Sequence, residues 1–199
     1  MNIFCIGDVV GQNGLEYLCN TLPSLKKSLG VDVCIVNGEN SDACGRGISR
    51  NGAEAIFSHG ADVITTGNHC FQRTKQETFE EQEYLLCPAN FPFLPSQAGR
   101  CQLDLGRAQL QVINLSGVAF MEPLDNPFIC FDRLYDPSCR FTIVDFHAES
   151  TAEKKAFGYY VAQRASAVFG THTHVPTADG CILPGGCGYI TDVGMCGPI

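Results

Sequence analysis

The chain has 199 residues, a formal net charge of -8 and 45% apolar residues. This length and composition predict one globular domain with its own core. The acidic excess argues against nonspecific binding of duplex nucleic acid, which needs a basic surface, although bound cations would still attract a phosphate group. The apolar runs are too short to cross a bilayer and no basic segment precedes Lys26, so we expect a cytoplasmic protein.

The 12 cysteines are spread from Cys5 to Cys196, and no two of them have the CxxC spacing of zinc or redox pairs. Several lie inside apolar, strand-like runs. We therefore expect reduced, buried thiols, as is typical of a reducing compartment.

Short apolar runs alternate with helical patterns in the first third of the chain. We expect strands over 2–6, 31–36 and 62–66, with helices over 12–29 and 49–59 between them. Such alternation indicates βαβ units and a parallel sheet.

The remainder of the chain mixes irregular segments with further strands. Residues 88–98 are rich in proline and are expected to be irregular, and 116–137 is rich in turns. Ser150 and Glu153 form a capping box, which predicts that a helix begins near 151. We also expect a hairpin over 101–114, strands over 141–146 and 165–169, and a second hairpin over 181–193.

Polar residues follow the predicted strands, and four of the five histidines are among them: Asp8, Glu39, Asn40, Asn68, His69, His147, His172 and His174. Ligands of α/β sheets bind at the carboxyl ends of parallel strands, so these side chains converge if the strands share a sheet. The His-x-His spacing places both imidazoles on one face of an extended segment. His59, at a helix end, is expected to be structural.

This set of residues has the composition of a two-metal site. Imidazole, carboxylate and amide oxygen suit iron, manganese, zinc or nickel, and either Asp8 or Glu39 has two oxygens with which to bridge two ions. Two divalent ions against two carboxylates leave a net positive site, which favours an anionic ligand such as phosphate. Singly, each residue has a plain explanation: Asp8 as a helix cap, and His172 with His174 as satisfied loop residues.

Six strings resemble the calcineurin-like metallophosphoesterases: IGDVVG (6–11), VNGEN (36–40), TGNH (66–69), VDFHAE (144–149), GTHTHVPTAD (170–179) and ITDVGMCGP (190–198). They are most similar to the bacterial YmdB-like branch of 2′,3′-cyclic-nucleotide 2′-phosphodiesterases. The strings run through the whole chain in order, and GEN in place of the usual GDxxD is typical of this branch.

The resemblance implies a layered α/β/β/α sandwich of two mixed sheets flanked by helices. It implies one metal held by Asp8, Asn40 and His174, another held by Asn68, His147 and His172, and Glu39 as the bridge. His69 would be the general acid. The metals would be iron or manganese, and a hydroxide bridging them would hydrolyse a small phosphodiester, above all a 2′,3′-cyclic nucleotide.

Two features depart from the family pattern. Cys70-Phe71-Gln72 follows the GNH string, where a small residue, Trp and often an acid are expected. The chain stops at Ile199, whereas family members usually continue. We therefore expect a single domain over 1–199 that lacks the family's C-terminal segment, with a sheet edge through which the chain would pair with itself.

Other functions fit the residues less well. A dinucleotide-binding loop would use Gly7, Gly11 and Gly14, but Asp8 places a negative charge inside it. An amidohydrolase barrel also uses His-x-His, but eight βα units need about 250 residues. The remaining alternative is a catalytically weak regulatory or scaffolding protein of the same fold. Its partner surface would be the acidic run Glu77, Glu80, Glu81 and Glu83, for which a solvated helix face is the simpler interpretation.

Overall fold

A computed structural model describes residues 1–93 and 96–198. In the first third, the predicted βαβ units are confirmed. The elements are β1 (Ile3–Ile6), α1 (Gly11–Leu29), β3 (Val33–Asn37), α2 (Arg50–Ser58) and β4 (Val63–Thr65). Gly30 adopts the left-handed conformation that ends α1, and the Ser49 hydroxyl caps α2 by accepting from the Gly52 N–H group. These strands form a parallel sheet in the order β1-β3-β4.

The second sheet contains six strands in the order β5-β6-β7-β8-β10-β9. Both predicted hairpins are present, as the antiparallel edge pairs β5–β6 and β10–β9. The central strands are parallel. The Ser150 hydroxyl accepts from the Glu153 N–H group and starts the helix α5, as predicted. The elements are β5 (Arg100–Asp104), β6 (Gln109–Ser116), β7 (Phe141–His147), α5 (Thr151–Val161), β8 (Ala167–Thr171), β9 (Cys181–Ile182) and β10 (Gly188–Ile190).

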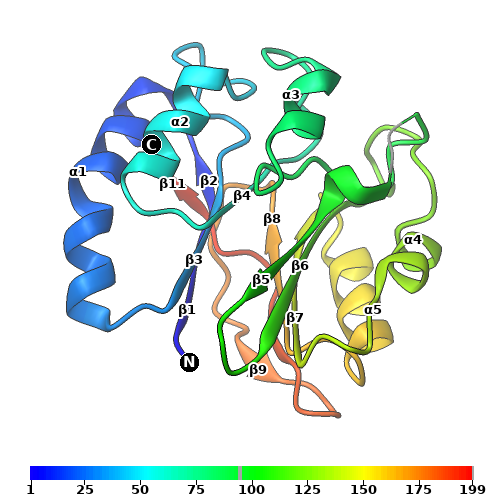
Figure 1. Ribbon diagram of the computed structural model, residues 1–199. Coiled ribbons are helices and arrows are strands. Elements are labelled where there is room, and N and C mark those ends of the chain that lie inside the picture. The colour runs from blue at the N-terminus through cyan, green and yellow to red at the C-terminus, as the bar shows by residue number, and fades with distance from the viewer. Residues whose placement is uncertain (94–95, 199) are drawn as a thin grey trace.

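Three apolar cores separate four layers, with α1 and α2 outside the first sheet and α4 and α5 outside the second (Figure 1). Alternate residues of one strand enter different cores, as Cys34 and Ile35 of β3 show: Cys34 faces the helices and Ile35 faces the other sheet. The α/β/β/α sandwich is therefore confirmed. The polar strand ends belong to two sheets packed face to face, not to the single sheet on which the convergence argument rested.

The structure adds elements that the sequence did not predict. The turn-rich segment 116–137 contains the helix α4 (Pro127–Leu134), which begins with proline and is capped by the Asn126 side chain. Within the segment expected to be irregular, η1 (Ser96–Gly99) is a 3₁₀ turn, and residues 94 and 95 lie outside the described residues. A short helix, α3 (Gln76–Glu81), follows the first sheet.

Two short strands from near opposite ends of the chain pair at the carboxyl edge of the sheets. The short strand β2 (Asp8–Val9) pairs in parallel with β11 (Met195–Cys196). A side chain at Gly7 would collide with the backbone of Gly194, so this crossing requires glycine. Asp8, which pairs with Met195 in this ladder, is fully buried.

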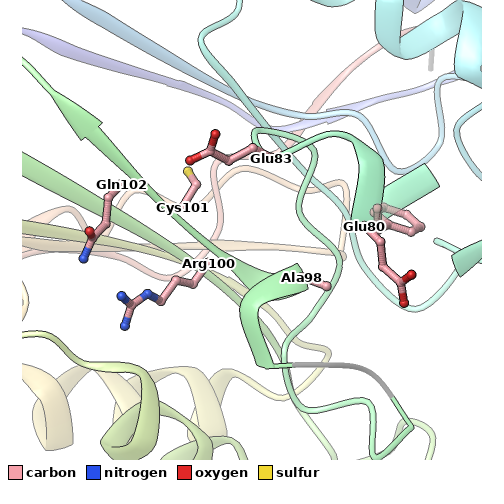
Figure 2. A pocket seen from close by; sticks show the side chains of 7 residues that line it. Glu80, Glu83, Ala98, Arg100, Cys101 and Gln102 are labelled. Atoms are coloured by element: carbon pink, nitrogen blue, oxygen red, sulfur yellow. The ribbon is translucent and has the colours of Figure 1, made fainter. Parts of the chain in front are cut away.

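All twelve cysteines are free thiols, most of them buried, and burial raises the pKa of Cys34 and of Cys87 to about 12. Within the described residues, no helix is both long and apolar enough to span a bilayer. A surface hollow lies beside β5, outside the predicted site (Figure 2); it is lined by Phe79, Glu80, Glu83, Ala98, Arg100, Cys101 and Gln102.

Candidate metal centre

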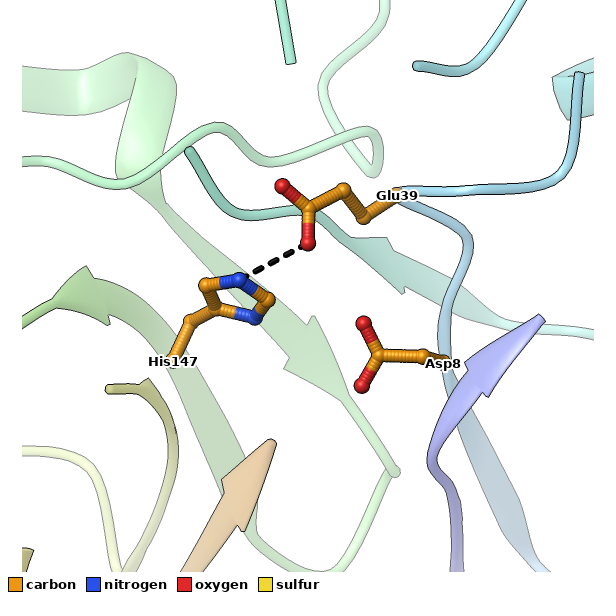
Figure 3. A group of neighbouring side chains, drawn as sticks. All are labelled: Asp8, Glu39 and His147. Atoms are coloured by element: carbon orange, nitrogen blue, oxygen red, sulfur yellow. Dashed lines mark ion pairs between the residues drawn. The ribbon is translucent and has the colours of Figure 1, made fainter. Parts of the chain in front are cut away.

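All eight predicted site residues lie at the carboxyl edge of the two sheets. The first sheet supplies those that follow β1, β3 and β4, and the second supplies those at the ends of β7 and β8. Asp8, Glu39 and His147 are buried and bring potential ligand atoms within 4.8 Å of one another (Figure 3).

The three residues assigned by resemblance to the first metal contact one another. The Asn40 Nδ2 atom lies 3.4 Å from Asp8 Oδ1 and 3.3 Å from His174 Nε2. His174 Nε2 lies 3.6 Å from the same Asp8 oxygen. Asn40 Oδ1 is buried and has no hydrogen-bond partner. Side chains from three segments of the chain therefore meet, and one of them, Asn40, also has an unsatisfied buried oxygen.

The second predicted group is also assembled. His147 Nε2 lies 3.1 Å from Asn68 Oδ1 and 3.1 Å from His172 Nδ1. On its other side, His147 Nδ1 lies 2.9 Å from the Thr171 hydroxyl, which itself donates to Asp145. Because that hydroxyl proton is used on Asp145, Thr171 accepts from Nδ1, and Nε2 is left facing the centre.

Glu39 lies between the two groups. Its Oε1 atom accepts from the His69 N–H group at 2.5 Å, and its Oε2 atom lies 2.8 Å from His147 Nε2. Despite this short contact, Oε2 is buried without an aligned hydrogen bond. One carboxylate oxygen thus fixes the backbone of His69, and the other points into the centre.

The centre fits metal ions by the chemistry of its donors. The centre brings together two carboxylates, two amide side chains and three imidazoles, and protein hydrogen-bond donors are too few to satisfy them. Buried polar atoms in native proteins are normally hydrogen-bonded, so this shortage needs an explanation. Cations of the kind that bind mixed nitrogen and oxygen ligands would satisfy the unpartnered oxygens of Glu39 and Asn40.

Electrostatics in the metal-free centre reflect the crowding of acids. Burial disfavours the charged imidazolium of His147, but Glu39, Asp8 and Asp145 outweigh it and raise the pKa of His147 to about 9. Burial also opposes ionisation of Asp8, but the hydrogen bond from His174 and the charge of His147 prevail and lower its pKa. A proton on His147 thus occupies the position that a cation would take.

Gly67 is needed for the position of His147. A Cβ atom at Gly67 would overlap the imidazole ring of His147. The glycine that precedes Asn68 therefore permits close approach of the ring, beyond its ordinary role in turns.

The loop that carries His172 and His174 corrects one prediction. Both residues have positive φ, 102° and 63°, so the segment is not extended as the His-x-His argument assumed. Thr173 between them donates two hydrogen bonds to Asp192, which also lies 2.6 Å from Lys154 Nζ. Asp192 and Lys154 are each 1% exposed, and this buried pair holds the loop in its left-handed conformation.

Two acidic neighbours of the site were missed by sequence reasoning. Glu149 lies 3.1 Å from His172 Nε2. Asp145 is fully buried and accepts from Thr65, Thr171 and Asn37, and burial raises its pKa to about 6 despite these bonds. Asp145 lies two residues before His147 in β7 and Glu149 lies two residues after it, and this spacing was the available signal.

His69 stands beside the two groups without joining either. Its side chain is half-buried, and its Nδ1 atom lies 2.8 Å from Gln72 Nε2. Because the Gln72 amide donates to Nδ1, the neutral imidazole carries its proton on Nε2. The departure from the family pattern at residue 72 thus provides a partner for His69.

Comparison with known proteins decides the family. The family model described as "YmdB-like protein" matches residues 4–199. The chain belongs to the YmdB-like family. The resemblance in the six strings is thereby confirmed. A Bacillus subtilis protein, 2′,3′-cyclic-nucleotide 2′-phosphodiesterase, is 45% identical over all of this chain and 76% of its own length.

Two solved structures share the fold closely. A protein from Thermus thermophilus superposes with a TM-score of 0.91 at 39% identity, over 98% of this chain and 77% of the other. A phosphatase from Mycoplasma pneumoniae superposes with a TM-score of 0.90 at 38% identity, over 98% and 72%. The named relatives are hydrolases of phosphate esters, which confirms the predicted enzyme class of this YmdB-like chain.

Proposed function

We propose that the chain is a two-metal phosphodiesterase that hydrolyses 2′,3′-cyclic nucleotides at the bond between phosphorus and O2′. The observation that carries the proposal is the convergence of buried acceptors around Glu39 and Asn40, because Glu39 Oε2 and Asn40 Oδ1 are buried without a hydrogen bond. The name of the Bacillus subtilis relative supplies the substrate class. Iron or manganese, the single-domain organisation over 1–199 and self-association through a sheet edge stay predictions.

The residues divide into two ligand sets around a shared carboxylate. One ion would be held by Asp8, Asn40 and His174, the other by Asn68, His147 and His172, with Glu39 between them. When bound, the two ions would supply positive charge to the phosphoryl oxygens and lower the pKa of water.

His69 supplies the proton that the leaving group needs. Its backbone is tied to Glu39, and its Nδ1 atom is engaged by the Gln72 side chain, which leaves Nε2 to face the leaving group. Water adds through its oxygen to phosphorus as the P–O2′ bond breaks. His69, in its imidazolium form, gives the Nε2 proton to O2′ and is left as neutral imidazole. The proton released by the water returns to solvent, and solvent reprotonates His69.

The test separates proton transfer from metal binding. His69→Ala is expected to lower kcat on 2′,3′-cyclic AMP by about 10²–10⁴-fold while two metal ions stay bound per chain. Asp8→Asn and Glu39→Gln are expected to lose metal as well as turnover. Metal content is measured by elemental analysis of gel-filtered protein. Equal metal loss in all three variants would refute the role of His69.

The scaffolding alternative predicts no metal-dependent turnover. Its suggested partner surface, the acidic run of Glu77, Glu80, Glu81 and Glu83, is exposed on and beside α3, and Glu81 pairs with Arg50. This arrangement is that of a solvated helix face. Hydrolysis of 2′,3′-cyclic AMP that requires metal and Asp8 would exclude the alternative.

A further inference from the structure

Phe120 is the most exposed of the large apolar side chains in the described part of the chain. Its exposed fraction is 90%, and its backbone has a positive φ of 64°. Left-handed backbone is unfavourable for a bulky residue, and an aromatic ring in water adds nothing to the fold. Phe120 combines an unfavourable backbone conformation with an exposed ring, and this combination indicates a role in function and not in folding.

The turn that carries Phe120 is held rigidly against the base of α5. The Gly117 N–H group donates to the His147 carbonyl at 2.9 Å. The next two N–H groups, of Val118 and Ala119, donate to the two oxygens of the Glu153 carboxylate at 3.0 and 3.2 Å. The exposed ring therefore stands on a braced turn whose first hydrogen bond is made to the backbone of a proposed metal ligand.

The same turn borders the candidate metal centre. The Met121 sulfur accepts from the Glu149 N–H group at 3.3 Å, and the Glu149 carboxylate lies 3.1 Å from His172 Nε2. Further along, Leu124 packs against the core that contains Cys70, the residue after His69. The segment 117–124 thus begins with a hydrogen bond to the His147 backbone, contacts Glu149, the partner of His172, and ends against the core of the first sheet.

We propose that Phe120 is the platform on which the nucleobase of the substrate stacks while its cyclic phosphate occupies the metal centre. The proposal rests on the proposed function. Every base has a π-face, so stacking on a phenyl ring tolerates any base. The ring offers no hydrogen-bond donor or acceptor, and this platform therefore favours nucleosides over base-free phosphodiesters without selecting one base.

The first test compares two substrates that differ only in the base. Phe120→Ala is expected to raise KM for 2′,3′-cyclic AMP about tenfold, in the range that a lost base stack causes, with kcat retained. Its effect on methyl β-ribofuranoside 2,3-cyclic phosphate, which has no base, is expected to be nil. Phe120→Trp restores the KM for cyclic AMP. Tyr159→Ala, which removes an exposed aromatic ring from α5, is the matched control and leaves both substrates unaffected.

A second variant guards against misfolding. Phe120→Gly removes the ring and the backbone strain together, so it is expected to unfold at the same temperature as the wild type or higher, yet to raise KM as Phe120→Ala does. Equal losses on both substrates, or no loss on either, would overturn the stacking role.

A binding measurement keeps this inference separate from the proposed function. In a His69→Ala background, 2-aminopurine riboside 2′,3′-cyclic phosphate is expected to lose fluorescence when it stacks on Phe120, and Phe120→Ala is expected to abolish the quenching. Wild-type protein that hydrolyses neither cyclic phosphate would refute the proposed function. Quenching that is independent of Phe120 would refute the platform, whatever the turnover.

Discussion

The buried pair of Lys154 and Asp192 holds the loop of His172 and His174, and its removal has a calculable cost. Asp192→Asn keeps the shape of the side chain but leaves the Lys154 ammonium group buried without a counter-charge; both residues are 1% exposed. Breaking such a pair costs about 3–5 kcal/mol, out of a total stability of about 5–15 kcal/mol for a domain. The mutation therefore removes a large part of the stability.

Thermal unfolding of the metal-free protein in chelator measures this cost. A domain of this length loses about 2–4 °C in Tm per kcal/mol, so Tm is expected to fall by about 6–20 °C. Lys155→Met is the matched control, because the neighbouring lysine is 52% exposed and lies 3.8 Å from Asp179. Its loss is expected to stay within about 1 kcal/mol.

The same variant tests whether the pair positions the histidines. Without charge pairing at Asp192, Thr173 loses a strong acceptor and the left-handed backbone of the loop relaxes, so Mn²⁺ affinity is expected to fall about 10–100-fold. Calorimetric titration below the lowered Tm reports this affinity on folded protein. A Tm within about 2 °C of the wild type would contradict the stabilising role of the pair, and unchanged affinity in a destabilised variant would contradict its role in positioning the histidines.

Three further predictions concern His147. Gly67→Ala is expected to displace the His147 ring, to lower Mn²⁺ affinity and to destabilise the fold by about 1–3 kcal/mol through overpacking. Gly188→Ala is the control, because a Cβ atom there would make only an ordinary 3.5 Å contact. Equal effects in both variants would contradict the role of Gly67. Because the pKa of metal-free His147 is raised to about 9, a metal must displace its proton below that pH, so affinity is expected to rise about tenfold per pH unit from 6.5 and to level off near 9. Because the folded chain holds the His147 proton more tightly than the unfolded chain does, this proton stabilises the metal-free fold. That stabilisation is complete below about pH 6.5 and is lost as pH rises through 9. Titrations at fixed ionic strength measure the first effect, and pH-independent affinity would contradict it.

The positions of the site residues were predictable because they follow strands. Asp8, Glu39 and His147 each end an apolar run, and parallel strands place such ends at one edge. That rule does not say how many sheets meet there. The face-to-face packing of two sheets depends on alternate residues of β3 and β7 fitting a shared core, which is a tertiary property.

The support of the site was harder to predict than the site itself. Lys154 and Asp192 are 38 residues apart and sit in a helix and a loop, so neither shows its partner in the sequence. The local pattern of the His-x-His segment indicated an extended backbone, whereas hydrogen bonds from Thr173 to Asp192 impose positive φ on both histidines. The buried contact between Thr173 and Asp192 therefore overrides the local preference of this segment for extended backbone.

The central claim, that two metal ions in this centre hydrolyse a cyclic phosphodiester, is tested most directly by a stoichiometric titration. Metal-free chain receives Mn²⁺ in fractions of an equivalent, and hydrolysis of 2′,3′-cyclic AMP is followed at each step with Asp8→Asn as control. We predict that turnover reaches its plateau at two equivalents and is absent from the control. A plateau at one equivalent, or two bound ions without turnover, would contradict the account.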